Sequence, residues 1–186
     1  ITLASTPVSH LIVRKTPAWY GLIQKSSYIG YAMPGVVIGL ALIFFGSRHL
    51  GSYYQTLPLL VFAYAIRFFP LSIGSNTTAI SSADVELIHA SRTLGVGPIR
   101  SFLKITFPLV TPSWLAGFCL VFLTVMKELP ITLMLRPTGF ETLVTLIWMA
   151  EDANFYGDAA LPIVMLLIVS GLSMILLLAQ EESNGR

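Results

Sequence analysis

The chain is a succession of long apolar stretches separated by short polar ones. Three windows contain no Asp, Glu, Lys or Arg, namely Ser26–Ser47, Ile105–Met126 and Ala159–Gln180. Each is long enough, at about 20 apolar residues per crossing, to span the hydrocarbon core of a membrane as a helix. A fourth window, Leu57–Asn76, is interrupted once, by Arg67, and the apolar start Ile1–Val13 is too short to span. The pattern predicts an all-α integral membrane protein with about five transmembrane helices, the first of them truncated.

Composition supports this class. Of the 186 residues, 55% are hydrophobic and only 11% are charged, and the mean hydropathy is +0.79. Soluble domains contain about a quarter charged residues, so too few polar side chains are present here to coat a water-facing surface. We expect one membrane domain over residues 1–186, which begins as a fragment inside its first helix. The net charge of +2 is too small to suggest nucleic acid as a partner.

The basic residues predict the orientation. If the chain crosses five times, seven Lys or Arg fall on one side and three on the other, with Arg67 left out because it lies within a span. The positive-inside rule makes the richer side cytoplasmic. That side holds Arg14, Lys15, Lys25, Arg92, Arg100, Lys104 and Arg186, and the outer side holds Arg48, Lys127 and Arg136.

The predicted cytoplasmic loop, about residues 77–107, contains signals for two short helices. Asp84 can cap a helix over Val85–Leu94, and Gly95 then suits a left-handed helix stop. Pro98 fits the first position of a second helix, and Pro108 opens the next span. Two amphipathic helices joined by a glycine turn form either a docking surface for a partner or an element on the membrane surface with basic residues facing phosphates.

The same loop resembles the EAA loop of binding-protein-dependent ABC importer permeases. That motif has a Glu-Ala-Ala triplet, then three residues, Gly, nine residues, Ile, one residue and Leu-Pro. Ala90, Gly95, Ile105 and Pro108 match its spacing. The triplet here is His89-Ala90-Ser91, so His89 stands where the family has Glu, and Glu86 lies one turn earlier. The resemblance implies that this loop inserts a coupling helix into a groove on a separate ABC ATPase.

Further segments resemble the C-terminal half of iron(III) transport permeases. They are residues 33–37 (MPGVV), 67–71 (RFFPL), 127–132 (KELPIT) and 135–143 (LRPTGFETL). The resemblance implies a multi-pass permease of the bacterial cytoplasmic (inner) membrane that carries ferric iron. Its implied partners are the ATPase, a periplasmic solute-binding protein and a second permease half or subunit. Alternatives are import of another small solute (thiamine, a polyamine or an oxyanion) and a membrane anchor or assembly factor that transports nothing.

Charged residues near the spans are candidates for the translocation pathway. An isolated Arg67 in mid-span costs at least about 2.5–3.5 kcal/mol, so it faces the bundle interior or a water-filled path. It is either a polar element of the pathway or a structural partner of Glu128. Lys127 and Glu128 end a span on the outer side, and the resemblance places them, with Pro130 and Thr132, near an outer gate. The alternative is an ordinary interfacial pair.

A short apolar segment and several missing motifs complete the expectations. Thr142–Ala150 is too short to cross and predicts a helix on the outer side. Gly46 and Gly51 have Walker spacing, but Ser52 and Tyr53 follow instead of Lys-Ser/Thr, so no nucleotide loop is expected. The histidines are scattered, which predicts no metal site. We expect a transporter subunit with no catalytic residues, no cofactor and no ATPase site of its own.

Overall fold

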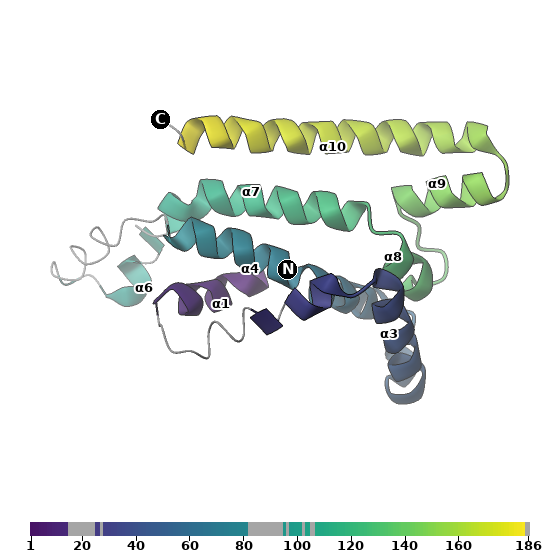
Figure 1. Ribbon diagram of the computed structural model, residues 1–186, viewed down its shortest axis with the longest axis horizontal. Helices are drawn as coiled ribbons and strands as arrows, with labels where there is room; N and C mark the ends of the chain where they lie inside the picture. Colours follow the sequence, from purple (N-terminus) through teal and green to yellow (C-terminus); the bar gives the residue numbers. More distant parts are fainter. Residues whose placement is uncertain are drawn as a thin grey trace.

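The computed structural model describes residues 1–14, 25, 26, 28–81, 95, 97–101, 103, 104 and 107–184, and these residues form helices and no strand. Figure 1 shows α7 between α4 and α10, which agrees with the contacts of α7 to both neighbours. The all-α prediction is confirmed. The elements are α1 (Thr2–Arg14), α3 (Gly35–His49), the 3-10 helix η1 (Gly51–Tyr53), α4 (Leu57–Ser81), α6 (Pro98–Ser101), α7 (Phe107–Met126), α8 (Pro130–Leu135), α9 (Leu143–Asp152) and α10 (Tyr156–Asn184).

Two helices among the described residues are long and apolar enough to cross a membrane, within Leu57–Thr78 and Tyr156–Ala179. α7 is shorter, and most of the predicted span Ile105–Met126 lies in it. The prediction of one continuous helix over Ser26–Ser47 is wrong. The chain leaves helical geometry at Met33 and Pro34, and Pro34 has φ −56° and ψ 137°. Proline lacks an N–H and disfavours helical geometry in the preceding residue, so a new helix, α3, begins at Gly35.

α4 is the central helix, in contact with α1, α3, α7 and α8. Pro70 lies inside it and has no N–H, which leaves the carbonyl of Ile66 without its usual helical donor. Gly30 packs against that carbonyl, since a β-carbon at Gly30 would lie 2.6 Å from the Ile66 oxygen. On the α7 side, a β-carbon at Gly117 would lie 2.6 Å from Cβ of Ser75. Two glycines therefore allow close approach to α4.

Buried polar side chains join the second half of α4 to α1 and α7. The Asn76 amide donates to the carbonyl of Thr2 at 3.1 Å and to Ser5 Oγ at 2.7 Å. It also donates to Thr6 Oγ1 at 3.3 Å, and Trp114 of α7 donates to the same hydroxyl at 3.1 Å. Because buried polar groups are costly without partners, this network fixes how the three helices pack.

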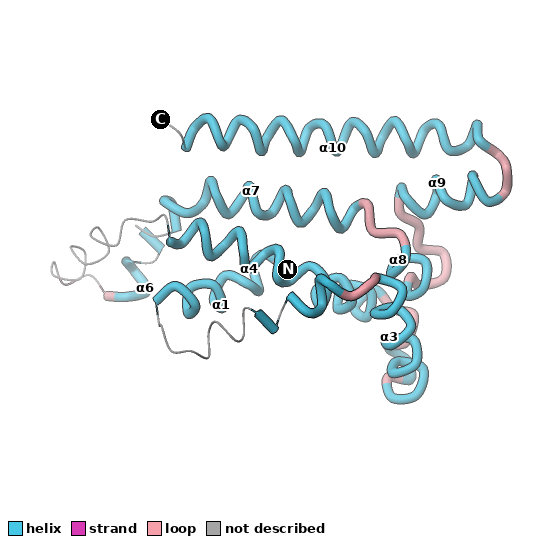
Figure 2. Tube along the Cα trace, in the orientation of Figure 1, coloured by secondary structure: helices cyan, strands magenta, loops and turns pink. Residues whose placement is uncertain are grey.

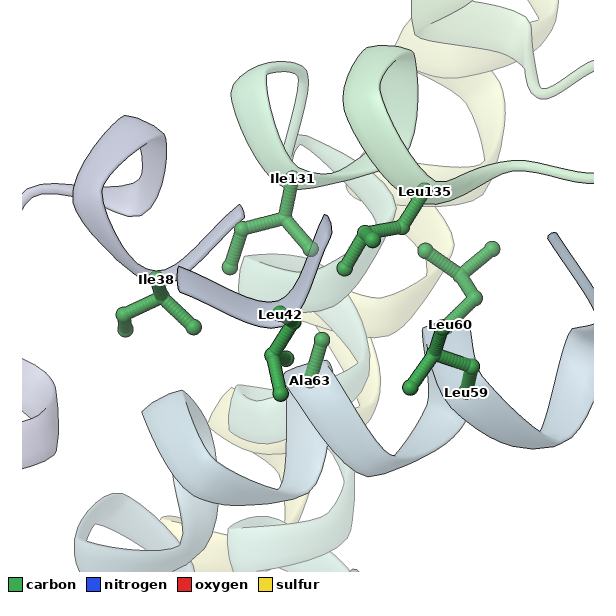
Figure 3. Packing of buried hydrophobic residues seen from close by; sticks show 7 residues of the cluster. All are labelled: Ile38, Leu42, Leu59, Leu60, Ala63, Ile131 and Leu135. Carbon is green, nitrogen blue, oxygen red and sulfur yellow. The ribbon is translucent and has the colours of Figure 1, made fainter. Parts of the chain in front are cut away.

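An apolar cluster lies around the first half of α4 (Figure 3). Ile131 and Leu135 of the short helix α8 are fully buried there, because α8 sits on α3 and α4. Each fully buried aliphatic side chain stabilises such packing by about 1.5–3 kcal/mol in water, and less where lipid replaces water. The cluster comprises Ile38, Leu42, Leu59, Leu60, Ala63, Ile131 and Leu135.

α6 and α8 lie at opposite ends of the bundle. In Figure 2 the described connections between α7, α8, α9 and α10 gather at the α8 end, and α6 lies at the other. The predicted helix within Thr142–Ala150 is confirmed as α9, which begins with a capping box between Thr142 and Thr145.

The predicted docking loop is described in part. α4 continues to Ser81, so the expected loop start at residue 77 is wrong, because the helix outlasts the apolar window. Gly95 has φ +76°, as a left-handed helix stop requires, and α6 begins at Pro98 as predicted. Pro108 lies in the first turn of α7. The predicted helix over Val85–Leu94, with Glu86, His89, Ala90 and Ser91, lies outside the described residues, as does Ile105.

Candidate functional site

A buried ion pair lies at the α8 end of the bundle. Nε of Arg67, in α4, is 3.7 Å from Oε2 of Glu128, in the turn that follows α7. The Glu128 side chain is 8% exposed and that of Arg67 is 22% exposed. Removing two charges from water is costly, and each charge offsets part of the cost for the other. Of the two interpretations of Arg67, the pairing with Glu128 is therefore observed.

Main-chain and hydroxyl groups hold Glu128 from the α8 side. The backbone N–H of Ile131 donates to Glu128 Oε1 at 3.2 Å, and the Thr132 hydroxyl donates to the Glu128 carbonyl. The Tyr64 hydroxyl, from α4, is 2.5 Å from Thr132 Oγ1. Tyr64 and Arg67 are three residues apart on α4, so they lie on neighbouring positions of one face. Both side chains of this face of α4 thus engage the α7–α8 turn.

Gly35 closes the site from the side of α3. A β-carbon there would lie 2.6 Å from Glu128 Oε1 and 3.3 Å from Cζ of Arg67. No side chain fits at this position without moving the ion pair. The helix break at Pro34 and the glycine after it therefore bring the start of α3 directly against the two charges.

The guanidinium of Arg67 is incompletely satisfied. Its Nε and Nη1 are buried and have no hydrogen-bond partner among the described residues, since 3.7 Å exceeds hydrogen-bonding distance. Its Cζ lies 5.7 Å from the ring centroid of Phe68, which contributes a weak cation–π contact. The pair is thus held by charge attraction and by the surrounding packing, and a polar group that enters the site finds free donors.

The structure separates the predicted gate residues. Arg67, Glu128 and Thr132 come together, whereas Lys127 is exposed. Pro130 occupies the first position of α8, where its missing N–H costs nothing. Tyr64 was missed by the sequence analysis, because a tyrosine in an apolar helix has no distinctive pattern.

A second ion pair fixes the connection from α8 to α9. Arg136 pairs with Glu141, whose carboxylate also accepts from Thr145 Oγ1 at 2.8 Å. Gly139 between them has φ +80°, which permits the tight return of the chain. No group of three or more His, Cys, Asp or Glu that would hold a metal ion occurs in the described part of the chain.

Relatives of the chain are membrane permeases. It is 30% identical over 155 residues to the Fe(3+)-transport system permease protein FbpB 2 of Haemophilus influenzae, which covers 83% of this chain and 31% of that one. It is 31% identical over 134 residues to the molybdenum transport system permease protein ModB of Escherichia coli K12 (66% and 58%). The putative 2-aminoethylphosphonate transport system permease protein PhnV of Salmonella typhimurium is 26% identical over 161 residues (86% and 60%).

The chain thus spans between about a third and three fifths of these relatives' lengths. Among solved structures, the MetNI methionine ABC transporter in inward-facing conformations gives a TM-score of 0.70 at 16% identity. That match covers 96% of this chain and 90% of the other and shows a shared fold. The sequence profile of the family described as "Binding-protein-dependent transport system inner membrane component" matches residues 5–181. The chain therefore belongs to the family of binding-protein-dependent transport system inner membrane components.

Proposed function

We propose that this chain is the membrane-spanning permease part of an ABC importer that moves a small solute, with ferric iron as the favoured cargo. A periplasmic binding protein would deliver the solute, and a separate ATPase would drive transport. The family match over residues 5–181 carries the proposal. The relative from Haemophilus influenzae, 30% identical over 83% of this chain and named as an Fe(3+) permease, supports iron.

The α6 end would be the cytoplasmic, ATPase-docking end. The docking residues are proposed from the motif as Glu86, His89, Ala90, Ser91, Gly95, Ile105 and Pro108. The left-handed geometry at Gly95 and the start of α6 at Pro98 support this, because both give the chain the turn that follows a coupling helix. Pro108 then directs the chain into α7.

The α8 end would be the outer end of the translocation pathway. Arg67, Glu128 and Thr132 line its proposed gate, with Pro130 setting the turn and Lys127 at the exposed rim. The buried ion pair with its unpartnered donors supports this role, because a buried ion pair contributes little net stability to the fold and so points to a role beyond stability.

Gly95→Asp tests the docking proposal. A residue other than glycine at φ +76° is strained by about 1 kcal/mol or more, and the new charge has to be desolvated against the ATPase. We expect the variant to insert normally but to lose co-purification of the ATPase and transport. Gly97→Asp, a neighbouring glycine with open space around it, is the matched control. His89→Glu, which restores the family's residue, is expected to keep or strengthen docking. Wild-type ATPase recovery with Gly95→Asp would favour a membrane-surface element.

The cargo is tested by uptake. Cells that carry the whole transporter are expected to accumulate radioactive iron, and excess molybdate or 2-aminoethylphosphonate is expected to leave this uptake unchanged. Relatives named for those two anions make them the first alternative cargoes. A gene without a neighbouring ATPase and binding-protein gene would favour the anchor or assembly alternative.

A further inference from the structure

Four side chains form a closed circuit between α4 and the α7–α8 turn. Arg67 and Tyr64 extend from one face of α4, and Glu128 and Thr132 extend from the turn and α8. The ion pair joins Arg67 to Glu128, and the hydroxyl contact joins Tyr64 to Thr132. Thr132 also bonds the Glu128 carbonyl, which closes the circuit.

The direction of the hydrogen bonds follows from the number of protons. Thr132 has one hydroxyl proton, and it is donated to the Glu128 carbonyl. The 2.5 Å contact between Thr132 and Tyr64 therefore has Tyr64 as its donor. Phenylalanine at position 64 removes this bond, valine at position 132 removes both bonds, and serine at position 132 retains both.

We propose that Tyr64 is a positioning residue for the outer gate, and that the closed circuit keeps the resting transporter shut until the loaded binding protein arrives. This inference rests on the proposed function. Arg67 Nε and Glu128 Oε2 are 3.7 Å apart and make no direct hydrogen bond, so the distance between the two charges depends on where the turn is held. Tyr64, through Thr132 and the Glu128 carbonyl, holds that turn against α4, close to the guanidinium.

The closed circuit thus acts as a lock on the gate. Weakening this lock shifts the population toward the open state, and the lost interaction free energy sets the change in the equilibrium constant. One hydrogen bond contributes a net free energy equivalent to an about two- to tenfold change in such an equilibrium. Tyr64→Phe and Thr132→Val weaken the same connection between α4 and the turn. The effect of the double variant is therefore expected to exceed that of either single variant only slightly.

The test uses the whole transporter, reconstituted with its ATPase in nanodiscs, with and without loaded binding protein. Tyr64→Phe and Thr132→Val are expected to raise the resting ATPase rate about two- to tenfold. The rate with loaded binding protein should stay near wild type. Thr132→Ser is expected to behave as wild type. Tyr54→Phe removes a hydroxyl from a tyrosine packed on the same apolar cluster, and Thr124→Val removes a bond from Thr124 to the Leu120 carbonyl within α7. Both serve as controls and should leave the resting rate unchanged.

Unchanged resting rates in Tyr64→Phe and Thr132→Val overturn the lock. A parallel fall of resting and stimulated rates, with less complex recovered, also overturns it, because that is the result of a purely structural contact. An equal rise in the control variants does the same. If the wild-type chain recovers no ATPase at all, the proposed function fails before the lock is tested on any variant, and the two failures are thus distinguished.

Discussion

Gly35 lies directly against the carboxylate of Glu128, so that a β-carbon at position 35 would be 2.6 Å from Oε1. The atoms that such a β-carbon would displace are the ends of two side chains, those of Arg67 and Glu128. The ion pair would yield before the backbone, which makes position 35 a way to disturb the pair without removing either charge.

Gly35→Ala is expected to abolish most solute uptake while thermal stability changes by less than about 1 kcal/mol, because alanine also favours the helix. Uptake and thermal unfolding are measured on the same preparations. Gly171→Ala, at a glycine of α10 with no neighbouring atom within 4 Å of the added carbon, is the control and should retain both properties. Uptake at the wild-type level in Gly35→Ala would show that the spacing of the pair is unimportant.

Removal of one member of the Arg67–Glu128 pair is expected to be worse than removal of both. A single change leaves a charge buried without its partner, at a cost of about 3 kcal/mol, the lower end of the range because Arg67 remains 22% exposed. Arg67→Leu and Glu128→Leu are compared with the double variant by thermal unfolding in detergent. Additive losses in the double variant would mean that the two charges do not interact.

Accessibility to reagents from each side tests the orientation. Arg100→Cys, exposed in α6, is expected to label only from the cytoplasm, and Asp152→Cys, exposed at the end of α9, only from outside. Arg100 is chosen because its neighbour Ser101 is only 3% exposed. The native Cys119 is buried and should add no background. Labelling of both sites from outside intact cells would overturn the orientation and, with it, the ATPase-docking end.

Asn76→Ala is expected to destabilise the packing of α1 on α4 by about 1–3 kcal/mol, since it removes the hydrogen bonds that the two amide protons share among Thr2, Ser5 and Thr6. Thermal unfolding measures the change. Ser47→Ala, which removes only an exposed bond to Phe44 of the same helix, should change stability by less than about 0.5 kcal/mol. Equal effects of the two variants would show that the network does not fix the packing.

Sequence patterns predicted the helices better than their breaks. The helices α4, α7 and α10 were predicted from apolar windows, because a membrane crossing needs an apolar run of about 20 residues. The break at Pro34 was missed, since a hydropathy window averages over a single proline. The left-handed geometry of Gly95 was predicted correctly because its signal is local, namely a glycine directly after a predicted helical segment.

The candidate site could be predicted only in part, because it is assembled from distant segments. Arg67 was recognisable as a charge in an apolar span, and its pairing with Glu128 was one of two open alternatives. Tyr64 became meaningful only once Pro130 had turned the chain and placed Thr132 beside α4. Lys127 is exposed and Glu128 is buried, although the two are adjacent after α7. The sequence alone does not show which of two neighbouring charged residues is buried.

The sparse surroundings of α10 have a consequence for how this sequence can change over evolutionary time. α10 contacts mainly α7 and α9, and only 11% of its apolar stretch is buried by the chain itself, against 39% for α4. Few positions of α10 are therefore constrained by packing within this chain, so exchanges among Leu, Ile, Val and Met there should have little effect on the chain's own core. α4 packs against four different helices, so a substitution along α4 has to be matched by one in α1, α3, α7 or α8. Inherited changes in α4 should therefore come in pairs.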